Sequence, residues 1–517
     1  MNVQGVIPSR YFPGIAVALI LGSLYAFTLL PGPGYSGDTV KFQFVGRVLG
    51  TPHGPGYPTY VVLNHWFTGL LPIGSIALKA NLLSSVFSIM ASLILLASLS
   101  RLGIPGLIAS VTAVSFGLGL TVWSQSIVAE VYSLNLLFVA GTVYCFLRWH
   151  LERNDHFFYS ACALYAISFG NHLTMITLLP AIIYFVWVTD RKVFLNPRKI
   201  LWVLFVMMFG AAQYAYVFLR TASPTTPYLE MTAPDLRTFW SNVTGGQFKH
   251  LLFGLSVTWM ILERLPALLL FILREFLIAI PLPFVGERSL PSPEVRRFLW
   301  LCLAGNLLFA LGYAIPDIDV YLIPAYFVLA IFSAAGLQYV STWLTKRFRA
   351  YKPWFVVVLP ISIFIMNVNP VNQKSNTTHD GIVKEALQSV DGDAIIVCPD
   401  YHSAMFFWYH IFIDGWKDRN IHVVFFHDQR FPAGELSEYV FRDLPFEVTV
   451  TRDILPTKLP VYLFIGVLHV AGSGNHDAKG ELLLRQRQLS EVGLLLVKKN
   501  GELYRVLPVQ VETLTQK

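Results

Sequence analysis

Long apolar runs dominate the chain and alternate with short polar connections. Stretches such as "GIAVALILGSLYAFTLL" and "IALKANLLSSVFSIMASLILLASL" reach the roughly 20 residues with which a helix crosses a bilayer. One soluble core could not bury so many runs, so the pattern predicts a polytopic α-helical membrane protein with about eleven transmembrane helices. The expected spans lie near residues 13–31, 76–100, 104–122, 127–147, 157–170, 173–189, 200–219, 265–285, 298–315, 320–341 and 354–368.

Two of the apolar segments depart from this pattern. Residues 57–72 are short and interrupted, which favours a re-entrant or interfacial helix over a crossing. The expected span 265–285 contains Arg274 and Glu275. A charge at mid-membrane costs about 2.5–3.5 kcal/mol on insertion scales, so we expect both side chains to face protein.

From about residue 375 the pattern changes to that of a small soluble domain. "DAIIVCPD", "IHVVFFHD" and "VYLFIGVLHV" are typical of buried strands, and "GELLLRQRQLSEVG" is typical of a helix. In "LLLVKKNGELYRVL" an Asn-Gly pair separates two alternating runs, which indicates a hairpin. We therefore expect a transmembrane domain over residues 1–370 and an α/β domain over residues 371–517.

Composition agrees with a membrane protein. The chain is 55% hydrophobic and only 13% charged, against about 25% charged in soluble domains. The net charge of +7 is dispersed between apolar segments, so no nucleic-acid partner is expected. The four cysteines show neither a disulfide framework nor metal-ligand spacing.

The basic residues predict the topology. One set of loops is rich in them: Arg10, Arg101, Arg148, Arg153, Arg191, Lys192, Arg198, Lys199, Arg288, Arg296, Arg297, Lys346, Arg347, Arg349 and Lys352. The alternate set holds few: Lys41, Arg47, Arg237 and Lys249. The positive-inside rule places the first set and the N-terminus in the cytoplasm. The C-terminal domain then lies outside, and we expect a multi-pass protein of a bacterial inner or plasma membrane.

Polar residues scattered along the sequence gather on this outer side. They are Asp38, Lys41, Arg47, His53, His65, Lys79, Gln125, Glu130, Asn171, His172, Asp317 and Asp319. Ionisable groups at a membrane edge are candidates for function because leaving them unpaired in hydrocarbon is unfavourable. Their convergence on one face argues more strongly for a site than any single residue does.

Each candidate also has a purely structural explanation. Asp38 could cap the helix suggested by "DTVKFQFVGRVL", and His53 could be a hydrogen-bonded turn residue. His172 follows a Gly-Asn turn and could close a helix end, while Lys79 could extend to the interface. Glu130 stands within an apolar helix pattern, where even a structural role requires a partner. Asp317 and Asp319, beside a proline, could form a turn.

The chemistry that these residues favour is group transfer from a lipid-phosphate substrate. Cations can hold a lipid phosphate, and Asp38 could accept a proton from an attacking hydroxyl. The departing phosphate is already stabilised, so such a site needs positioning and charge compensation. The sequence has no Walker loop, no G-x-S-x-G elbow and no H-E-x-x-H motif, which argues against ATP-driven transport and the common hydrolases.

Five motifs in order resemble a known family. "GD…LGTPHGPGYPTY…LKANLLSS", "WSQSIVAEVYSLN", "SFGNHLTM", "FWSNVTGGQFKHLLF" and "IPDIDVYLIPAY" are similar to motifs of a GT-C-class membrane glycosyltransferase family. Its animal branch comprises the ectodomain protein O-mannosyltransferases, and it has bacterial relatives. The resemblance covers roughly residues 12 to 430. It implies a GT-C-like fold with the catalytic aspartate in the first extracytoplasmic loop, and a polyprenyl-phosphate-linked sugar as donor.

The resemblance also assigns residues. The family reads Asp-Ser-Gly-Glu fifteen residues before a His-Pro-Pro-Gly-Tyr-Pro motif. Asp38 stands fifteen before His53, Lys41 replaces the glutamate, and Gly54 replaces the first proline. The resemblance thus implies a catalytic group of Asp38, Glu130, His53 and His172. The substrate-binding group would be Lys41, Arg47, Tyr57, His65, Lys79, Gln125, Asn171, Asp317 and Asp319.

The expected enzyme moves a sugar, mannose being one candidate, to a hydroxyl of protein Ser or Thr outside the cell. A transferase that modifies a glycolipid or cell-wall polymer would show the same donor half. A lipid-linked-sugar flippase would instead show polar groups through the membrane and inverted repeats. We assign no metal ligands and no certain cofactor, and a divalent cation stays open because the family's second carboxylate is replaced.

Overall fold

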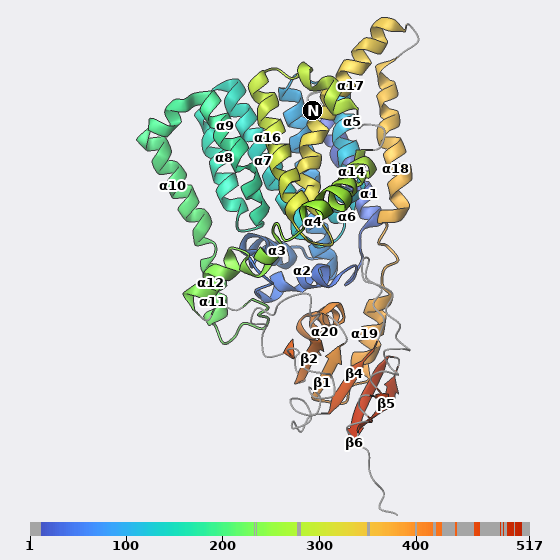
Figure 1. The fold of residues 1–517 in the computed structure, drawn as a ribbon. Helices are drawn as coiled ribbons and strands as arrows, with labels where there is room; N and C mark the ends of the chain where they lie inside the picture. The colour runs from blue at the N-terminus through green and yellow to red at the C-terminus, as the bar shows by residue number, and fades with distance from the viewer. Residues whose placement is uncertain are drawn as a thin grey trace, which may run out of the picture.

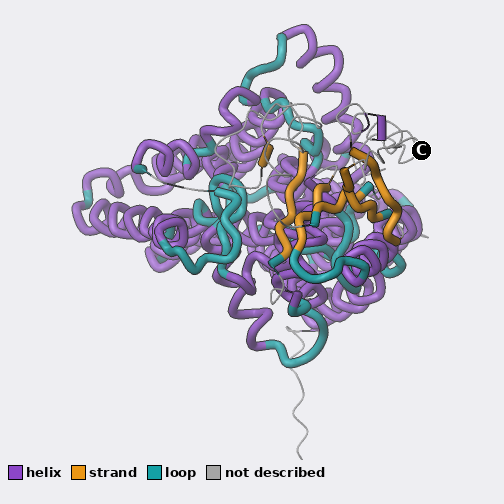
Figure 2. Tube along the Cα trace, turned by 90° about the horizontal axis from the view of Figure 1, so that it is seen from below, coloured by secondary structure: helices purple, strands orange, loops and turns teal. Residues whose placement is uncertain are grey.

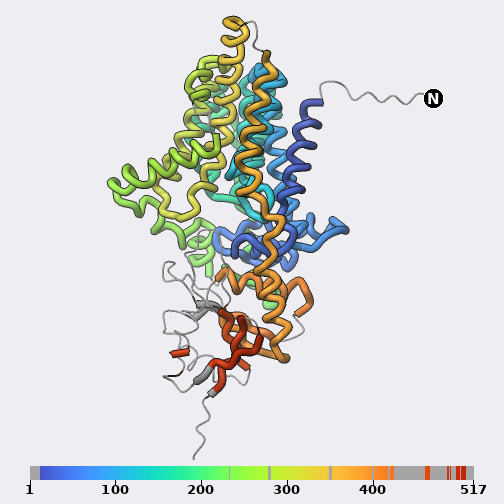
Figure 3. Tube along the Cα trace, turned by 90° about the vertical axis from the view of Figure 1, so that its right-hand side faces the viewer, coloured from blue at the N-terminus to red at the C-terminus, as the bar shows by residue number. Residues whose placement is uncertain are grey.

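The computed structural model describes residues 12–231, 233, 235–276, 281–348, 352–398, 401–416, 420–426, 440–441, 460–465, 486–487, 490, 494–500 and 502–508. It shows an upright helical bundle with a small sheet domain at one end (Figure 1). Seen from the side, α1 runs down the bundle toward the end that carries this domain (Figure 3).

Apolar helices build the bundle. They are α1 (Phe12–Thr28), α4 (Ile76–Arg101), α5 (Gly106–Gly117), α6 (Leu120–Ser126), α7 (Val131–Glu152), α8 (Asp155–Ser168), α9 (Leu179–Asp190), α10 (Pro197–Ala212), α11 (Ala215–Ala222), α14 (Leu265–Phe276), α15 (Leu282–Gly286), α16 (Pro293–Gly312), α17 (Ile323–Arg347) and α18 (Val358–Val371). Short helices join several of them: η2 (Leu173–Leu178), η3 (Arg191–Leu195), η4 (Gly246–Leu251), α13 (Val257–Trp259), η5 (Met260–Arg264), η7 (Glu287–Ser289), η8 (Val320–Leu322) and η9 (Pro353–Val357).

A helix lies at each expected span, but not every helix satisfies the length and apolarity of a crossing. Within the described residues seven helices do, and eight if α5 and α6 count as one span bent by 67°. α1 is a shorter apolar helix. α8 and α14 lie at the remaining two expected spans, 157–170 and 265–285, but do not satisfy the length and apolarity of a crossing. The polytopic helical class is therefore confirmed, and the number eleven stays a prediction.

The expected span 265–285 contains two described helices, and residues 277–280 between them lie outside the described residues. α14 ends at Phe276, and α15 begins at Leu282. Glu275 is buried, and its carboxylate accepts hydrogen bonds from the amides of Thr121 (2.8 Å) and Val122 (3.2 Å), so the prediction that it faces protein is confirmed. The side chain of Arg274, the preceding residue of α14, is exposed, so the same prediction is not confirmed for it.

Two helices lie crosswise at the end of the bundle nearest the sheet domain: α2 (Gly37–Val48) and α3 (Pro58–Leu70). α3 is the interfacial helix expected in residues 57–72 (Figure 1). It exposes apolar side chains such as Trp66, which is 61% exposed. α12 (Leu236–Val243) lies at the same level beside α11.

The C-terminal domain contains a six-stranded sheet of order β3-β2-β1-β4-β6-β5. Its strands are β1 (Ala394–Cys398), β2 (Ile421–Phe426), β3 (Val440–Phe441), β4 (Val461–Phe464), β5 (Leu494–Asn500) and β6 (Leu503–Pro508). The first four are parallel, and β5 and β6 form the expected antiparallel hairpin. The strand predictions are confirmed, whereas most of the helix expected in "GELLLRQRQLSEVG" lies outside the described residues.

One helix connects the sheet to the bundle. α19 (Thr378–Gln388) and α20 (Tyr401–Ile413) accompany the sheet, and α20 packs on both β2 and α2. Seen from below, the strands cover part of this end of the bundle (Figure 2). The domain therefore reaches α2 through α20.

Candidate active site

α2 positions the aspartate that the motifs single out. Ser36 caps this helix with its hydroxyl, which accepts a hydrogen bond from the amide of Thr39 (3.1 Å). Asp38 is therefore not the cap, contrary to one interpretation of the sequence, but stands in the first turn, where the helix dipole favours a carboxylate. Its side chain is 49% exposed, so it is open to a substrate.

Lys41 lies one turn further along α2, at the centre of a polar cluster. Its side chain has no exposed surface. The ammonium nitrogen lies 2.7 Å from Asp38 Oδ1, 2.6 Å from the hydroxyl of Tyr401 and 3.1 Å from Glu230 Oε2. It also contacts Nδ1 of His53. The donors of Lys41 are thus turned toward protein groups, and its expected substrate-binding role stays a prediction.

Glu230 supplies the second carboxylate of the cluster, and the motifs did not indicate it. Residues 228–231 pair with Thr51, whose carbonyl accepts from the amide of Glu230 (2.8 Å). The carboxylate accepts from the amide of His53 (3.0 Å) and from the hydroxyl of Tyr228 (3.0 Å). Glu230 therefore balances the charge of Lys41 and holds the backbone of His53 at the start of the loop 53–55.

The C-terminal domain contributes Tyr401, a second residue that the motifs missed. Its hydroxyl donates to Asp38 Oδ1 (2.8 Å) and accepts from Lys41. The neighbouring His402 accepts from the amide of Gly37 through Nδ1 (2.8 Å). Two elements more than 350 positions apart in sequence thus meet at the N-terminus of α2.

The polar loop before α3 holds His53 in a neutral state. The loop has a cis peptide bond between Gly54 and Pro55, and Tyr57 has a positive φ of 44°. Burial and the neighbouring Lys41 lower the pKa of His53. Because Nδ1 faces an ammonium, Nε2 carries the proton and points at the hydroxyl of Tyr57 (3.0 Å).

Glu130 lies beside this cluster, at the start of α7. It caps the helix with extended backbone, so it does not lie within a helix as the sequence pattern suggested. Its carboxylate accepts from the hydroxyl of Thr39 (2.8 Å) on α2. Burial, with the charge of Asp38 as a smaller cause, raises the pKa of Glu130 to about 8. Glu130 is therefore largely protonated at neutral pH and can donate a hydrogen bond.

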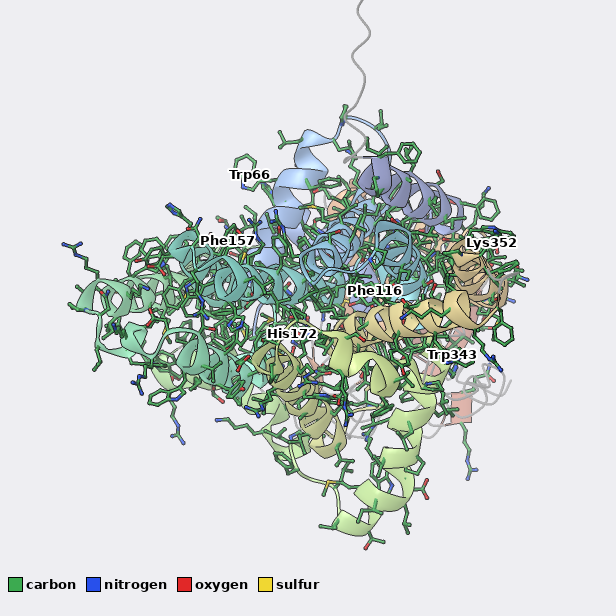
Figure 4. The ribbon with its side chains drawn as sticks, turned by 90° about the horizontal axis from the view of Figure 1, so that it is seen from above. Trp66, Phe116, Phe157, His172, Trp343 and Lys352 are labelled. Atoms are coloured by element: carbon green, nitrogen blue, oxygen red, sulfur yellow. The ribbon has the colours of Figure 1, made fainter. Side chains whose placement is uncertain are left out.

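His172 closes the site opposite α2. As one interpretation of the sequence expected, it caps a helix: its Nδ1 accepts from the amide of Thr174 (3.3 Å) at the start of η2. Its ring lies 6.3 Å from that of Tyr57 and 5.6 Å from those of Tyr132 and Tyr321. Burial lowers the pKa of His172 to about 4. Figure 4, seen from above, shows it in the middle of the molecule, whereas Trp66 points outward from the rim.

Electrostatics keep Asp38 ionised. Burial alone would raise its pKa, but the charge of Lys41 and the hydrogen bonds from Lys41 and Tyr401 hold the pKa well below its usual value. The same carboxylates raise the pKa of Lys41. Asp38 is consequently available as a proton acceptor or hydrogen-bond acceptor at every physiological pH.

Two of the other expected substrate-binding residues border the cluster. Asp317 is exposed, and its pKa is raised to about 6 by burial of the carboxyl group and, to a smaller extent, by the charge of Asp38. Asn171 is buried, and its amide donates to the carbonyl of Val131 (3.1 Å), next to Glu130.

Several expected residues lie away from the cluster. Arg47 is exposed nine residues beyond Asp38, about 14 Å along α2 at 1.5 Å per residue. His65 contacts the carbonyl of Gly46 through Nδ1 (2.9 Å), and Lys79 donates to the carbonyl of Thr68 (3.3 Å). These residues therefore do not reach Asp38. Two others lie on neighbouring elements and make no recorded contact with the Asp38 cluster: Gln125 and Asp319.

The cluster does not present a metal site. Within the described part of the chain, no three His, Cys, Asp or Glu side chains are arranged to hold a metal ion. Asp38, His53 and Glu230 approach one another, but the ammonium of Lys41 contacts all three. A permanent protein cation thus stands where three ligands could otherwise converge.

These side chains suit transfer to a hydroxyl. An ionised carboxylate has one oxygen held by Lys41 and Tyr401 and half of its surface exposed. The neutral His172 and the protonated Glu130 supply hydrogen-bond donors nearby. Such a group can accept a proton from a nucleophile on one side and stabilise developing charge on the other.

Comparison with known sequences supports this interpretation. Residues 38–194 match the family model described as the Protein O-mannosyl-transferase TMEM260 N-terminal domain. The chain is 34% identical over 128 residues to Protein O-mannosyl-transferase TMEM260 of Mus musculus, covering 24% of this chain and 18% of the mouse protein. It is 23% identical over 234 residues to the protein of that name from Dictyostelium discoideum, covering 42% of this chain and 28% of the relative. The chain thus spans less than a third of either relative.

Comparison with solved structures shows the fold. ArnT from Cupriavidus metallidurans overlaps 96% of this chain and 97% of its own, at 10% sequence identity. The TM-score is 0.64 for apo ArnT and 0.61 for ArnT bound to undecaprenyl phosphate. The resemblance drawn from the five motifs is confirmed. The chain therefore has the GT-C-like fold that the motifs implied, which it shares with ArnT, and is similar through residues 38–194 to the protein O-mannosyl-transferase TMEM260 N-terminal domain.

Proposed function

We propose that this protein is a membrane glycosyltransferase that moves a sugar, mannose by its relatives' names, from a polyprenyl phosphate to a protein Ser or Thr hydroxyl. The observation that carries the proposal is Asp38, an ionised, half-exposed carboxylate oriented by Lys41 and Tyr401. Further support comes from relatives that are named O-mannosyl-transferases and from an ArnT structure that contains undecaprenyl phosphate.

The proposed reaction is a single displacement. The acceptor oxygen attacks the anomeric carbon while its proton passes to Asp38. The bond between that carbon and the phosphate oxygen breaks, and the leaving polyprenyl phosphate keeps the electron pair. A single displacement inverts the configuration at the anomeric carbon. Asp38 need not be a strong base, because the acceptor hydroxyl loses its proton only as its oxygen bonds to the anomeric carbon.

The leaving phosphate would be stabilised mainly by neutral donors. Lys41 is enclosed and His53 is neutral, so neither offers a free positive charge to the phosphate. Protonated Glu130 and the Nε2–H of His172 remain as hydrogen-bond donors that become stronger partners as negative charge develops. In this proposal they take the role that the sequence predicted for cations, which was to hold the lipid phosphate.

The site is also proposed to work with a protein cation at its centre. Lys41 occupies the space between Asp38 and Glu230, so transfer is expected to continue at an unchanged rate after chelation with EDTA. Lys41→Glu, which introduces the family's residue, would place three carboxylates together and should create Mn²⁺ binding detectable by electron paramagnetic resonance. Loss of wild-type turnover in EDTA, restored by Mg²⁺ or Mn²⁺, would contradict this part.

We further propose that the α2 side faces the extracytoplasm of a bacterial inner or plasma membrane. The distribution of basic residues between loops supports this orientation. The proposed site then lies at the outer edge of the bilayer, where α2 and α3 lie crosswise, and the lipid-linked donor would enter it from this edge.

The test compares full-length wild type and Asp38→Asn in detergent. Both are incubated with a panel of polyprenyl-phosphate sugars and a Ser/Thr-rich peptide, and release of polyprenyl phosphate is measured. We expect turnover to fall at least about a hundredfold in Asp38→Asn, the usual range for a lost general base, with donor affinity retained. Asp235→Asn is the control, because Asp235 caps α12 in an exposed position.

Two outcomes would overturn the proposal. Equal turnover in wild type and Asp38→Asn would remove Asp38 as the base. Donor binding without turnover in either protein, together with donor movement across vesicles, would favour a flippase. Transfer to a glycolipid and not to the peptide would retain the chemistry and change the acceptor class.

A further inference from the structure

The N-terminus of α20 contacts the proposed base directly. Tyr401 and His402 are the first two residues of this helix. The hydroxyl of Tyr401 uses both its hydrogen-bonding functions inside the site, donating to Asp38 and accepting from Lys41. Burial, with the charge of Asp38 as a further cause, raises the pKa of Tyr401 well above its usual value, so the hydroxyl keeps the proton that it donates.

The close approach depends on a residue without a side chain. A Cβ atom at Gly37 would lie 2.7 Å from Nδ1 of His402 and 2.8 Å from a ring carbon of Tyr401, both inside normal contact distance. Gly37 therefore allows α20 to meet α2 at this point. The amide of Gly37 is in turn bonded to His402.

Other contacts hold α20 in place without the hydroxyl of Tyr401. Tyr409, two turns along the helix, accepts a hydrogen bond from the amide of Ala77 (3.2 Å) on α4. The rings of Phe412 and Phe44 lie 5.6 Å apart, and those of Trp408 and Tyr228 lie 5.4 Å apart. The apolar face of α20 thus packs on the bundle, and a phenylalanine at position 401 would leave this packing intact.

The hydroxyl has a clear geometric effect on Asp38. Each hydrogen bond that the described side chains make to this carboxylate goes to Oδ1, from Lys41 (2.7 Å) and Tyr401 (2.8 Å). Two donors on one oxygen fix the plane of the carboxylate. The other oxygen, Oδ2, accepts no hydrogen bond from the described side chains, and the Asp38 side chain is 49% exposed, so Oδ2 is left for an acceptor hydroxyl.

We propose that Tyr401 is a positioning residue that orients Asp38, so that the catalytic site is complete only when the C-terminal domain is docked on α2. The inference rests on the proposed function, because it assigns the orientation of its base. It gives the C-terminal domain a part in the chemical step. Transfer should then depend on the hydroxyl of Tyr401, whereas donor binding should not.

The experiment compares Tyr401→Phe with Tyr409→Phe in the full-length protein. Both variants remove one hydroxyl from α20, but only the first hydroxyl touches Asp38. With polyprenyl-phosphate mannose and the peptide acceptor, we expect kcat of Tyr401→Phe to fall roughly ten- to a hundredfold, the usual effect of one hydrogen bond to a charged group. The donor KM should stay within about twofold, and Tyr409→Phe should keep the wild-type kcat.

The pH dependence separates positioning from a general structural role. The hydroxyl stabilises the ionised form of Asp38, so its removal should shift the acidic limb of the kcat profile to higher pH. Merely loosened packing would lower kcat without moving this limb. A wild-type kcat and an unmoved limb in Tyr401→Phe would overturn the proposal.

Hydrogen exchange provides a readout that does not depend on the donor. Gly37→Ala should speed exchange in peptides covering residues 35–41, because the added Cβ displaces α20. Tyr401→Phe should also speed exchange there, relative to Tyr409→Phe. If wild type shows no turnover with any donor, the proposed function fails, and hydrogen exchange alone tests the contact between Tyr401 and Asp38. Faster exchange in Tyr401→Phe than in Tyr409→Phe would support this contact. Equal exchange in the two variants would reject it.

Discussion

Lys41 is a buried cation between two carboxylates. Its environment shows why placing a lysine where the resemblance predicts a glutamate changes the charged partners that the site requires. Its ammonium lies within 3.1 Å of oxygens of both Asp38 and Glu230. Burying one unpaired charge is strongly unfavourable, so a lysine here requires matching anions. The chain supplies the second anion from position 230, on a loop that also fixes the backbone of His53.

The energetic coupling of Lys41 and Glu230 can be measured directly. Lys41→Met leaves Glu230, which is 10% exposed, without its counter-ion, and we expect a loss of about 3 kcal/mol in the free energy of unfolding. Adding Glu230→Gln should recover part of this loss, because the unpaired charge is removed. Denaturation in detergent, followed by tryptophan fluorescence, gives the double-mutant cycle. Strictly additive losses would contradict a direct interaction.

Glu130 makes a prediction about pH. Its pKa is raised to about 8, so the carboxyl is protonated below this pH and ionised above it. If the proton serves the leaving phosphate, turnover should fall roughly tenfold per pH unit above pH 8, as the protonated form disappears. Glu130→Gln keeps a donor at every pH and should lose this basic limb. Glu385→Gln, on the exposed face of α19, is the control, and an unchanged limb in Glu130→Gln would refute the role.

Local sequence was sufficient to predict some residues of the candidate site and not others. Asp38 and His53 stand in a polar loop at a distinctive spacing, and Glu130 is an acid beside an apolar run, so each has a local signal. Glu230 and Tyr401 have none, because their role arises only when distant segments meet. Both also lie outside the matched region 38–194.

At the scale of the element, hydrophobic patterns predicted helices better than they predicted crossings. A helix forms at every expected span, because local apolar sequence is enough for helix formation in a membrane. Whether a helix crosses depends on its length and on tertiary contacts. Glu275 in α14 makes such a contact, since its carboxylate accepts hydrogen bonds from the amides of Thr121 and Val122 at the start of α6. Nothing in the apolar pattern of residues 265–285 reports that contact.

The close crossing of α15 and α17 gives a prediction about packing. A Cβ at Gly336 would lie 2.8 Å from the Cα of Leu282, and one at Gly286 would meet the backbone of Gly336. Gly336→Ala should therefore overpack the crossing and lower the free energy of unfolding by about 1–3 kcal/mol. Gly106→Ala on α5, where a Cβ meets no atom within 4 Å, is the matched control. Thermal unfolding in detergent compares them, and equal stability of both variants would refute the close packing.

At the scale of the whole molecule, the proposed topology can be tested by labelling. Cys145, Cys302 and Cys398 are buried, so a Cys162→Ser background leaves few reactive thiols. In that background, Glu385→Cys on α19 should react with a membrane-impermeant maleimide on intact cells. The exposed Lys192→Cys on η3 should react only after permeabilisation. The reverse pattern would invert the orientation predicted from the basic residues.

The arrangement of the site has a consequence for how the protein is made. Ribosomes synthesise and deliver α2 long before α20, because Asp38 and Tyr401 are 363 positions apart. During that interval Asp38 is already in the membrane but lacks the hydroxyl that orients it. Synthesis of the final quarter of the chain would then complete the catalytic site. A chain truncated before α20 would insert into the membrane but would not modify the proteins around it.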